Sequence, residues 1–210
     1  HKISNLYIAS ANPMGPQGLF LSIDGAGIKN LTVSGSISNC MGSAGIAASA
    51  TSPKIENCVN EVAIDVKAGN PLPVGGIVGT ASGTGYIRNC ENHGNLSGVI
   101  TAGGIVGTTI NSTKPTKVSI ENCVNSGAIH ATGGAAGGIT ATYSYDGKEN
   151  GLYLCRNTGN VTSVSGNAGG IAAQFTGKNS TQSVIEKCEN TATVTAKNYA
   201  GGIVGYVTNT

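Results

Sequence analysis

Six cysteines are the residues of this 210-residue sequence best suited to metal binding or redox chemistry. Five of them are spaced 32 or 33 residues apart, at Cys58, Cys90, Cys123, Cys155 and Cys188. The sixth, Cys40, falls outside this series. Zinc sites need thiolates that converge on one point, usually with a Cys-x-x-Cys pair, which the sequence lacks. We therefore expect no metal site and no cofactor.

The regular spacing instead predicts one thiol per structural repeat, stacked in a column about 4.8 Å apart. Free cysteine packs as a small hydrophobic residue, so a buried thiol stack is our interpretation. Disulfides along the column are the alternative. They would leave one of five thiols unpaired, and side chains in register point the same way rather than at each other.

Histidines and carboxylates give no sign of an active site. His93 lies three residues past its cysteine and His130 lies seven past its own, so we expect them in different columns with no Asp beside either. A Ser-His-Asp arrangement then has no anchor. Glycoside hydrolysis needs two convergent carboxylates, whereas the acids here recur at repeat positions. We expect the chain not to be an enzyme.

Composition narrows the partners. Charged residues make up 10% of the chain and the formal net charge is +2, with no basic block, which argues against nucleic-acid binding. No run approaches the ~20 apolar residues of a membrane span, so we expect no membrane insertion. The sequence opens at His1 without Met, inside a repeat, and we interpret residues 1–210 as one domain cut from a longer protein.

Two motifs alternate along the chain. Gly-Gly-Ile begins at Gly75, Gly103, Gly137, Gly169 and Gly201. The other reads aliphatic, any residue, often Asn, then Cys or Leu, and its copies start at Ile3, Ile28, Ile55, Ile87, Ile120, Leu152 and Ile185. Two residues past each repeating cysteine stands another asparagine: Asn60, Asn92, Asn125, Asn157 and Asn190.

Such units bury their apolar side only by stacking on one another. Glycine disfavours helix, and short β-branched clusters between turn residues are typical of strands. Each unit has three such clusters. The sequence therefore predicts an all-β fold, a right-handed parallel β-helix of about seven coils with three short strands per coil.

The spacing of Ile87 and Cys90 requires a bend between them, because residues three apart in a straight strand face opposite sides. Asn89 can supply the bend, since Asn tolerates left-handed backbone angles. Stacked Asn side chains can also bond to one another from coil to coil. Leu154 and Lys187 replace Asn at this position, so we expect the ladder to be interrupted there.

These motifs, Cys-x-Asn-x-Gly followed by Gly-Gly-Ile-Val-Gly, resemble the GLUG-motif repeats of bacterial secreted and cell-surface proteins. The resemblance covers nearly the whole chain. It implies a parallel β-helix and an extracellular or cell-surface location in a bacterium. It does not imply a particular activity.

We therefore expect a non-catalytic, adhesin-like stalk or binding platform, with a surface protein or glycan and the neighbouring domains of the parent chain as partners. The alternative is a carbohydrate-active β-helix enzyme or a glycan-binding module. The segment 143–150 concentrates aromatic and charged residues, and Tyr side chains are common in binding surfaces. Tyr143, Tyr145 and Asp146 are our candidates for partner contact, against the alternative of an ordinary solvated loop.

Overall fold

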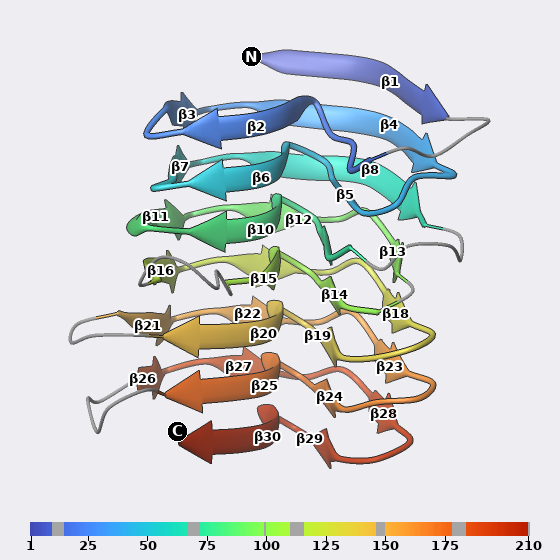
Figure 1. Ribbon diagram of the computed structural model, residues 1–210, viewed down its shortest axis with the longest axis vertical. Helices are drawn as coiled ribbons and strands as arrows, with labels where there is room; N and C mark the ends of the chain where they lie inside the picture. Colours follow the sequence, from blue (N-terminus) through green and yellow to red (C-terminus); the bar gives the residue numbers. More distant parts are fainter. Residues whose placement is uncertain are drawn as a thin grey trace.

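The computed structural model describes residues 1–9, 15–66, 72–98, 100–109, 116–145, 150–177 and 184–209. These residues form thirty β-strands and no helix. The strand pairs are parallel, and they build four sheets that run along a stack of about six turns, with the two ends of the chain at opposite ends of the stack (Figure 1). The predicted parallel β-helix is thus confirmed.

Sheet A has eleven strands. They are β1 (Lys2–Ala9), β4 (Thr32–Ser38), β8 (Val59–Asp65), β12 (Glu91–Asn92), β13 (Leu96–Gly98), β17 (Val124–Asn125), β18 (Ile129–Ala131), β22 (Arg156–Asn157), β23 (Val161–Ser163), β27 (Glu189–Asn190) and β28 (Val194–Ala196). The long β8 pairs with both β12 and β13, so each later coil crosses sheet A in two short strands rather than one.

Sheets B and C follow sheet A along the chain. Sheet B consists of β5 (Ser43–Ala44), β9 (Val74–Gly75), β14 (Ala102–Gly103), β19 (Ala136–Gly137), β24 (Ala168–Gly169) and β29 (Ala200–Gly201). Sheet C consists of β2 (Phe20–Asp24), β6 (Ala47–Thr51), β10 (Val78–Ser82), β15 (Val106–Thr108), β20 (Thr140–Tyr145), β25 (Ala172–Gly177) and β30 (Val204–Asn209). The Gly-Gly-Ile motif forms the turn between them.

Sheet D closes each coil. It consists of β3 (Gly27–Lys29), β7 (Lys54–Glu56), β11 (Thr84–Arg88), β16 (Lys117–Glu121), β21 (Gly151–Tyr153) and β26 (Val184–Glu186). The three apolar clusters expected in each coil therefore become up to five short strands on four sheets. The extra divisions arise because the chain bends inside sheet A and again within the Gly-Gly-Ile turn.

The predicted bend at Asn89 is confirmed. Its φ is 53°, and Ile87, two residues before it, and Cys90, directly after it, are both completely buried. Equivalent positive φ values recur at this corner in every coil, at Asn5, Asn30, Asn57, Asn122, Leu154 and Lys187. Leu154 and Lys187 keep the left-handed angle although they are not Asn, so coil geometry is preserved where the residue type is not.

Two asparagine ladders run along the stack. At the corner, the amide of Asn57 donates to Asn30, that of Asn89 to Asn57 and that of Asn122 to Asn89, over 2.9 to 3.2 Å. We call these residues the corner ladder. As expected, this ladder stops before Leu154.

The second ladder lies inside the coil and was not predicted as a ladder. We call it the interior ladder: Asn60, Asn92, Asn125, Asn157 and Asn190. The first four amides each donate to the Oδ1 of the next asparagine over 2.7 Å. All five also donate to the backbone carbonyl two residues further along their own chain segment. The first four members are fully buried. Buried amide groups need hydrogen-bond partners, and in this ladder the asparagine of the neighbouring coil supplies them.

The Gly-Gly-Ile motif belongs to the same structure. A Cβ atom on Gly104 would lie 2.0 Å from the Gly138 carbonyl oxygen and 2.5 Å from Cγ of Asn125. Gly138 stands in the same relation to Asn157. The second glycine is therefore required, because the turn passes directly over the interior ladder and leaves no room for a Cβ atom.

Aliphatic side chains fill the rest of the interior. Ile105, Ile139 and Ile171 are completely buried, and Ile203, in the last coil, is 36% exposed. The cysteine column also lines the interior: Cys58, Cys90, Cys123 and Cys155 are buried, and Cys188 is partly exposed. All six cysteines are free thiols, so the interpretation as a buried thiol stack is confirmed over the alternative of disulfides.

Candidate functional site

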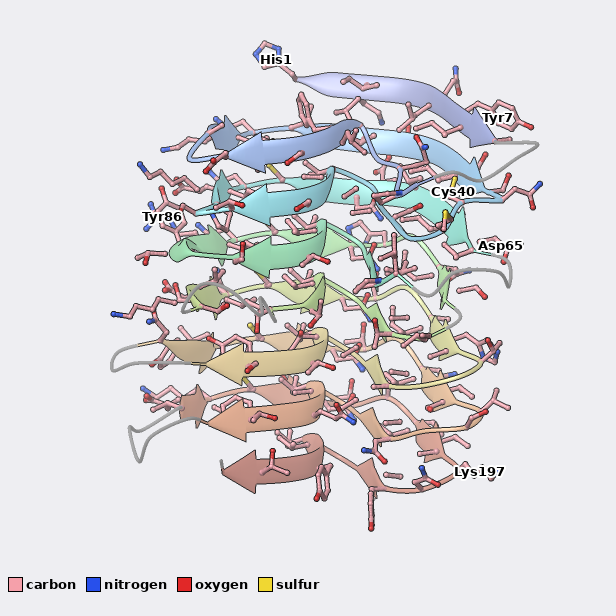
Figure 2. All side chains as sticks on the ribbon, in the orientation of Figure 1. His1, Tyr7, Cys40, Asp65, Tyr86 and Lys197 are labelled. Atoms are coloured by element: carbon pink, nitrogen blue, oxygen red, sulfur yellow. The ribbon has the colours of Figure 1, made fainter. Side chains whose placement is uncertain are left out.

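Among the described residues, the inward side chains form one continuous apolar core, and the exposed polar groups lie on the outer faces. On sheet A the side chains alternate strictly between interior and solvent, as in residues 91–97, where Asn92 and Leu96 are buried and Glu91, His93 and Asn95 are exposed. In-register pairing then places the outward side chains of successive coils in straight rows. We call this surface the sheet A face, and Asp65, at the end of β8, marks one side of it in Figure 2.

Glu91, His93 and Ser126 form a hydrogen-bonded chain on this face. The carboxylate Oε2 of Glu91 lies 3.0 Å from Nε2 of His93, and Nδ1 of His93 lies 2.7 Å from Oγ of Ser126. The contact with Ser126 crosses from one coil to the next. An ionised carboxylate can only accept hydrogen bonds, so Nε2 carries a proton, and in the neutral imidazole Nδ1 then presents its lone pair to the serine.

This arrangement corrects the sequence analysis, which found no anchor for a serine–histidine–acid constellation. The sequence did not indicate this site because Glu91 and Ser126 are 35 residues apart and come together only when neighbouring coils stack. A signal was present: stacking puts the residue three past one cysteine, His93, beside the residue three past the next, Ser126.

A second polar row crosses the same face. In-register pairing aligns Ser38, Asp65, Ser97, His130 and Thr162 on consecutive coils. Ser97 therefore lies between Asp65 and His130, which are two coils, or about 9.6 Å, apart. A catalytic triad needs the histidine in the middle, so this row lacks the order for proton relay.

A shallow groove of about 350 Å³ is hollowed into the sheet A face beside these rows. Its outward lining includes Ala63 and Ala128 as a small apolar floor, with Asp65, Asn95 and His130 around it. Asp65 is the one carboxylate among the lining residues, whereas glycoside hydrolysis uses two. The groove surface is mainly apolar with these few polar groups around it, and its lining lacks the second carboxylate that glycosidic cleavage uses.

Backbone donors near Ser126 are already engaged. The N–H of Ser126 donates to the Asn92 carbonyl over 2.8 Å and that of Gly127 to the same oxygen over 3.3 Å, while the N–H of Ala128 donates to Oδ1 of Asn95 over 2.9 Å. An oxyanion hole requires donors that are free for the developing negative charge. The coil-to-coil hydrogen bonds that build the solenoid thus consume the groups that acyl-transfer turnover would need.

The cysteine column offers little reactivity. Burial raises the pKa of the Cys123 thiol, whereas hydrogen bonds from Cys123 and Cys58 lower the pKa of Cys90 to about 4. A lowered pKa favours the reactive thiolate, but Cys90 and Cys123 are both buried in the column, out of reach of a reagent in solution. Within the described ranges, His, Cys, Asp and Glu form no group of three or more that could hold a metal ion.

The three predicted contact residues, Tyr143, Tyr145 and Asp146, have different outcomes in the structure. Tyr143 is 1% exposed, its hydroxyl donates to the Val118 carbonyl over 2.7 Å, and its ring stacks on Phe175. It is a core residue, because its hydroxyl finds a buried partner, and its assignment as a partner contact is wrong. Tyr145 ends β20, where its backbone pairs with Gly177, and Asp146 lies outside the described residues.

Charged side chains on sheet D form ion pairs at the surface. Nζ of Lys29 lies 3.1 Å from Glu56, and Arg88 lies 3.2 Å from the same carboxylate. These two cations hold the pKa of Glu56 below its usual value, Arg88 making the larger contribution. The column is a surface ion-pair network rather than a catalytic pair of acids.

No helix long and apolar enough to span a membrane occurs in the part of the chain that the structure describes.

Comparisons with known proteins bear on the fold. No family model and no curated protein matches the chain. One solved structure, a "putative immunoglobulin A1 protease" from Bacteroides ovatus, matches 92% of this chain and 67% of its own, with a TM-score of 0.56 and 21% sequence identity. A likeness at this identity shows a shared β-solenoid fold, and membership of the GLUG-repeat family stays a prediction.

Proposed function

We propose that this chain is a non-catalytic extracellular repeat scaffold, a stalk or binding platform on a bacterial surface. The observation that carries the proposal is the difference between the packed interior of the coils and their polar outer surface. Inward positions are filled by aliphatic side chains, thiols and the interior ladder, whereas the sheet A face presents straight rows of exposed polar side chains. A solenoid of this kind offers a long regular surface rather than one deep pocket.

The resemblance to GLUG-motif repeats supports an extracellular bacterial setting, and a Bacteroides protein with the same kind of fold is compatible with it. That neighbour's description as a protease raises the question of turnover here. The engaged backbone donors beside Ser126 and the single carboxylate of the groove argue against efficient catalysis.

A glycan-binding module is the second candidate, and the groove favours it. Asp65, Asn95 and His130 can hydrogen bond to hydroxyl groups, and Ala63 and Ala128 leave room above the floor. A surface protein reaching the same face is the other partner that this geometry would accept.

A glycan array probed with the whole chain distinguishes a glycan-binding module from a stalk that binds no glycan. Ala128→Trp fills the groove from outside without changing the interior, and it should abolish groove-dependent binding. Thr193→Trp is the matched control, because Thr193 is exposed in the same row, two coils away. Binding that survives Ala128→Trp would exclude the groove as the binding site.

Turnover is tested separately by incubating the chain with polysaccharides, peptides and immunoglobulin A1. The scaffold proposal expects no released product. Product release that is abolished by a single carboxylate substitution, such as Asp65→Asn or Glu91→Gln, would overturn it in favour of an enzyme.

A further inference from the structure

We propose that Ser126 is a histidine-activated nucleophile and a site of covalent modification by activated acyl donors, without turnover. This inference goes beyond the scaffold function and does not depend on it. It rests on the chain of Glu91, His93 and Ser126 across two adjacent coils.

Activation follows from the direction of the hydrogen bonds. In the neutral ring the Glu91 carboxylate holds the imidazole proton on Nε2, so Nδ1 is the acceptor for the serine hydroxyl. The Asn92 carbonyl is an alternative acceptor for the same hydroxyl at 3.3 Å, but the 2.7 Å contact with His93 is much shorter. Nucleophile, base and orienting acid are thus in the mutual geometry that nucleophilic catalysis requires.

Access to Ser126 is open. Ser126 is exposed, and the side chains of His93 and Glu91 are 42% and 50% exposed. The groove begins at the next outward positions along both strands, Asn95 and Ala128, so an acyl group bound to Ser126 could extend over its apolar floor. An acyl donor therefore needs no entry channel.

The reaction balances without another reagent. Ser126 Oγ forms a bond to the acyl carbon of an activated ester while its proton passes to Nδ1 of His93. The bond from the acyl carbon to the leaving oxygen then breaks, the electron pair goes to that oxygen, and His93 returns the proton to it. The products are an O-acyl serine and the free alcohol or phenol.

Release of the acyl group should be slow. Hydrolysis of an O-acyl serine has a poor alkoxide leaving group and needs stabilisation of its oxyanion. The N–H groups of Ser126, Gly127 and Ala128 are committed to other acceptors. Acylation of Ser126 is driven by the good leaving group of the activated donor. Hydrolysis of the acyl serine has neither a good leaving group nor free N–H donors for its oxyanion, so the adduct should accumulate.

The test is labelling of the whole chain with a fluorophosphonate probe and with p-nitrophenyl acetate, followed by peptide mass spectrometry. We expect one adduct at Ser126, a p-nitrophenol burst near one equivalent, and no steady-state turnover. His93→Ala should slow labelling about 100-fold, the low end of what a positioned general base contributes. Glu91→Gln should slow it less, because the imidazole remains but loses its anchor.

Ser97 provides the internal control. It is also on the sheet A face and directly beside a histidine, His130. Among the described residues, no acid is hydrogen-bonded or ion-paired to His130, in contrast to Glu91 and His93. Ser126 modified no faster than Ser97, or at a rate unchanged in His93→Ala, would overturn the proposal. Circular dichroism of each variant confirms that the fold persists, and Ser126→Ala must remove the adduct. Because the probe does not report glycan or protein binding, this result is independent of the scaffold test.

Discussion

The two asparagine ladders use the same residue type at the same repeat interval, yet they do different work. In the interior ladder the amides are buried, bond over 2.7 Å and persist through five coils without a gap. In the corner ladder the bonds are 2.9 to 3.2 Å long, are exposed to solvent and stop before Leu154. The backbone keeps the same positive φ where they stop.

The difference shows which property of asparagine each position needs. At the corner the structure needs a left-handed backbone angle, which other residues adopt at a cost. In the interior it needs a donor and an acceptor in each coil, because a buried amide without partners is strongly unfavourable. Burial, rather than residue type, decides what the side chain contributes.

Asn125→Ala should break the interior ladder with the largest effect on stability. It removes one of the two acceptors of the Asn92 amide, and it leaves the Oδ1 of Asn157 and the Gly127 carbonyl without the Asn125 amide that donates to them. At about 1 to 3 kcal/mol for each stranded group, and with incomplete additivity, we expect a loss of about 3 to 6 kcal/mol. Chemical denaturation measures it. Asn190→Ala, where the residue is only half-buried, should cost less.

Ile139→Ala tests the interior without touching either ladder. Its side chain is completely buried, so truncation should cost about 2 to 5 kcal/mol. Ile203→Ala is the matched change at a site that is 36% exposed, and its loss should be smaller. Similar losses at both sites would mean that burial does not govern stability along the stack.

Leu154→Asn, at the corner position, should raise the stability of the chain, whereas the substitutions in the interior lower it. Leu154 holds φ at 54° with its side chain 55% exposed, so little apolar burial is lost and a strained backbone is relieved. We expect a gain of about 1 kcal/mol in the free energy of unfolding, the lower end of the cost of a left-handed angle. A loss of stability would show that Leu154 packs usefully at the corner.

Thiol labelling compares interior and exterior without any substitution. In the folded chain Cys188 should react first, because it is partly exposed, and the four buried column thiols should react far more slowly. After denaturation without reductant all six should react with a thiol reagent, since all are free. Fewer than six would indicate disulfides.

Much of the fold was predictable from the sequence because each coil repeats the same local requirements. Ile87 and Cys90 had to face inward together, which fixed the bend at Asn89. The sequence did not predict the interior ladder, because a polar residue such as Asn92 is normally expected at the surface. Its inward position becomes clear only from the glycine turn that passes over it. Tyr143 was misassigned for the converse reason, since the carbonyl that satisfies its hydroxyl lies 25 residues away.

The outer site was the least predictable part. Glu91 and His93 are neighbours in sequence, but Ser126 joins them only through the register of β12 on β17. Rows on the sheet A face are readable once the repeat length of each coil is known. The coils differ in length by one residue yet keep this register, so the contact follows from aligning the coils on their cysteines and not from a fixed interval between residues.

One measurement tests the central claim most directly: the free energies of unfolding of Asn125→Gly and Asn122→Gly, determined side by side. The substitution is identical, and glycine accepts the corner's left-handed angle without strain. If the interior holds the stack and leaves the outer surfaces free for function, Asn125→Gly should lose about 3 kcal/mol or more. Asn122→Gly should then lose about 1 kcal/mol at most, through its exposed hydrogen bonds. Equal losses at the two positions would contradict the account.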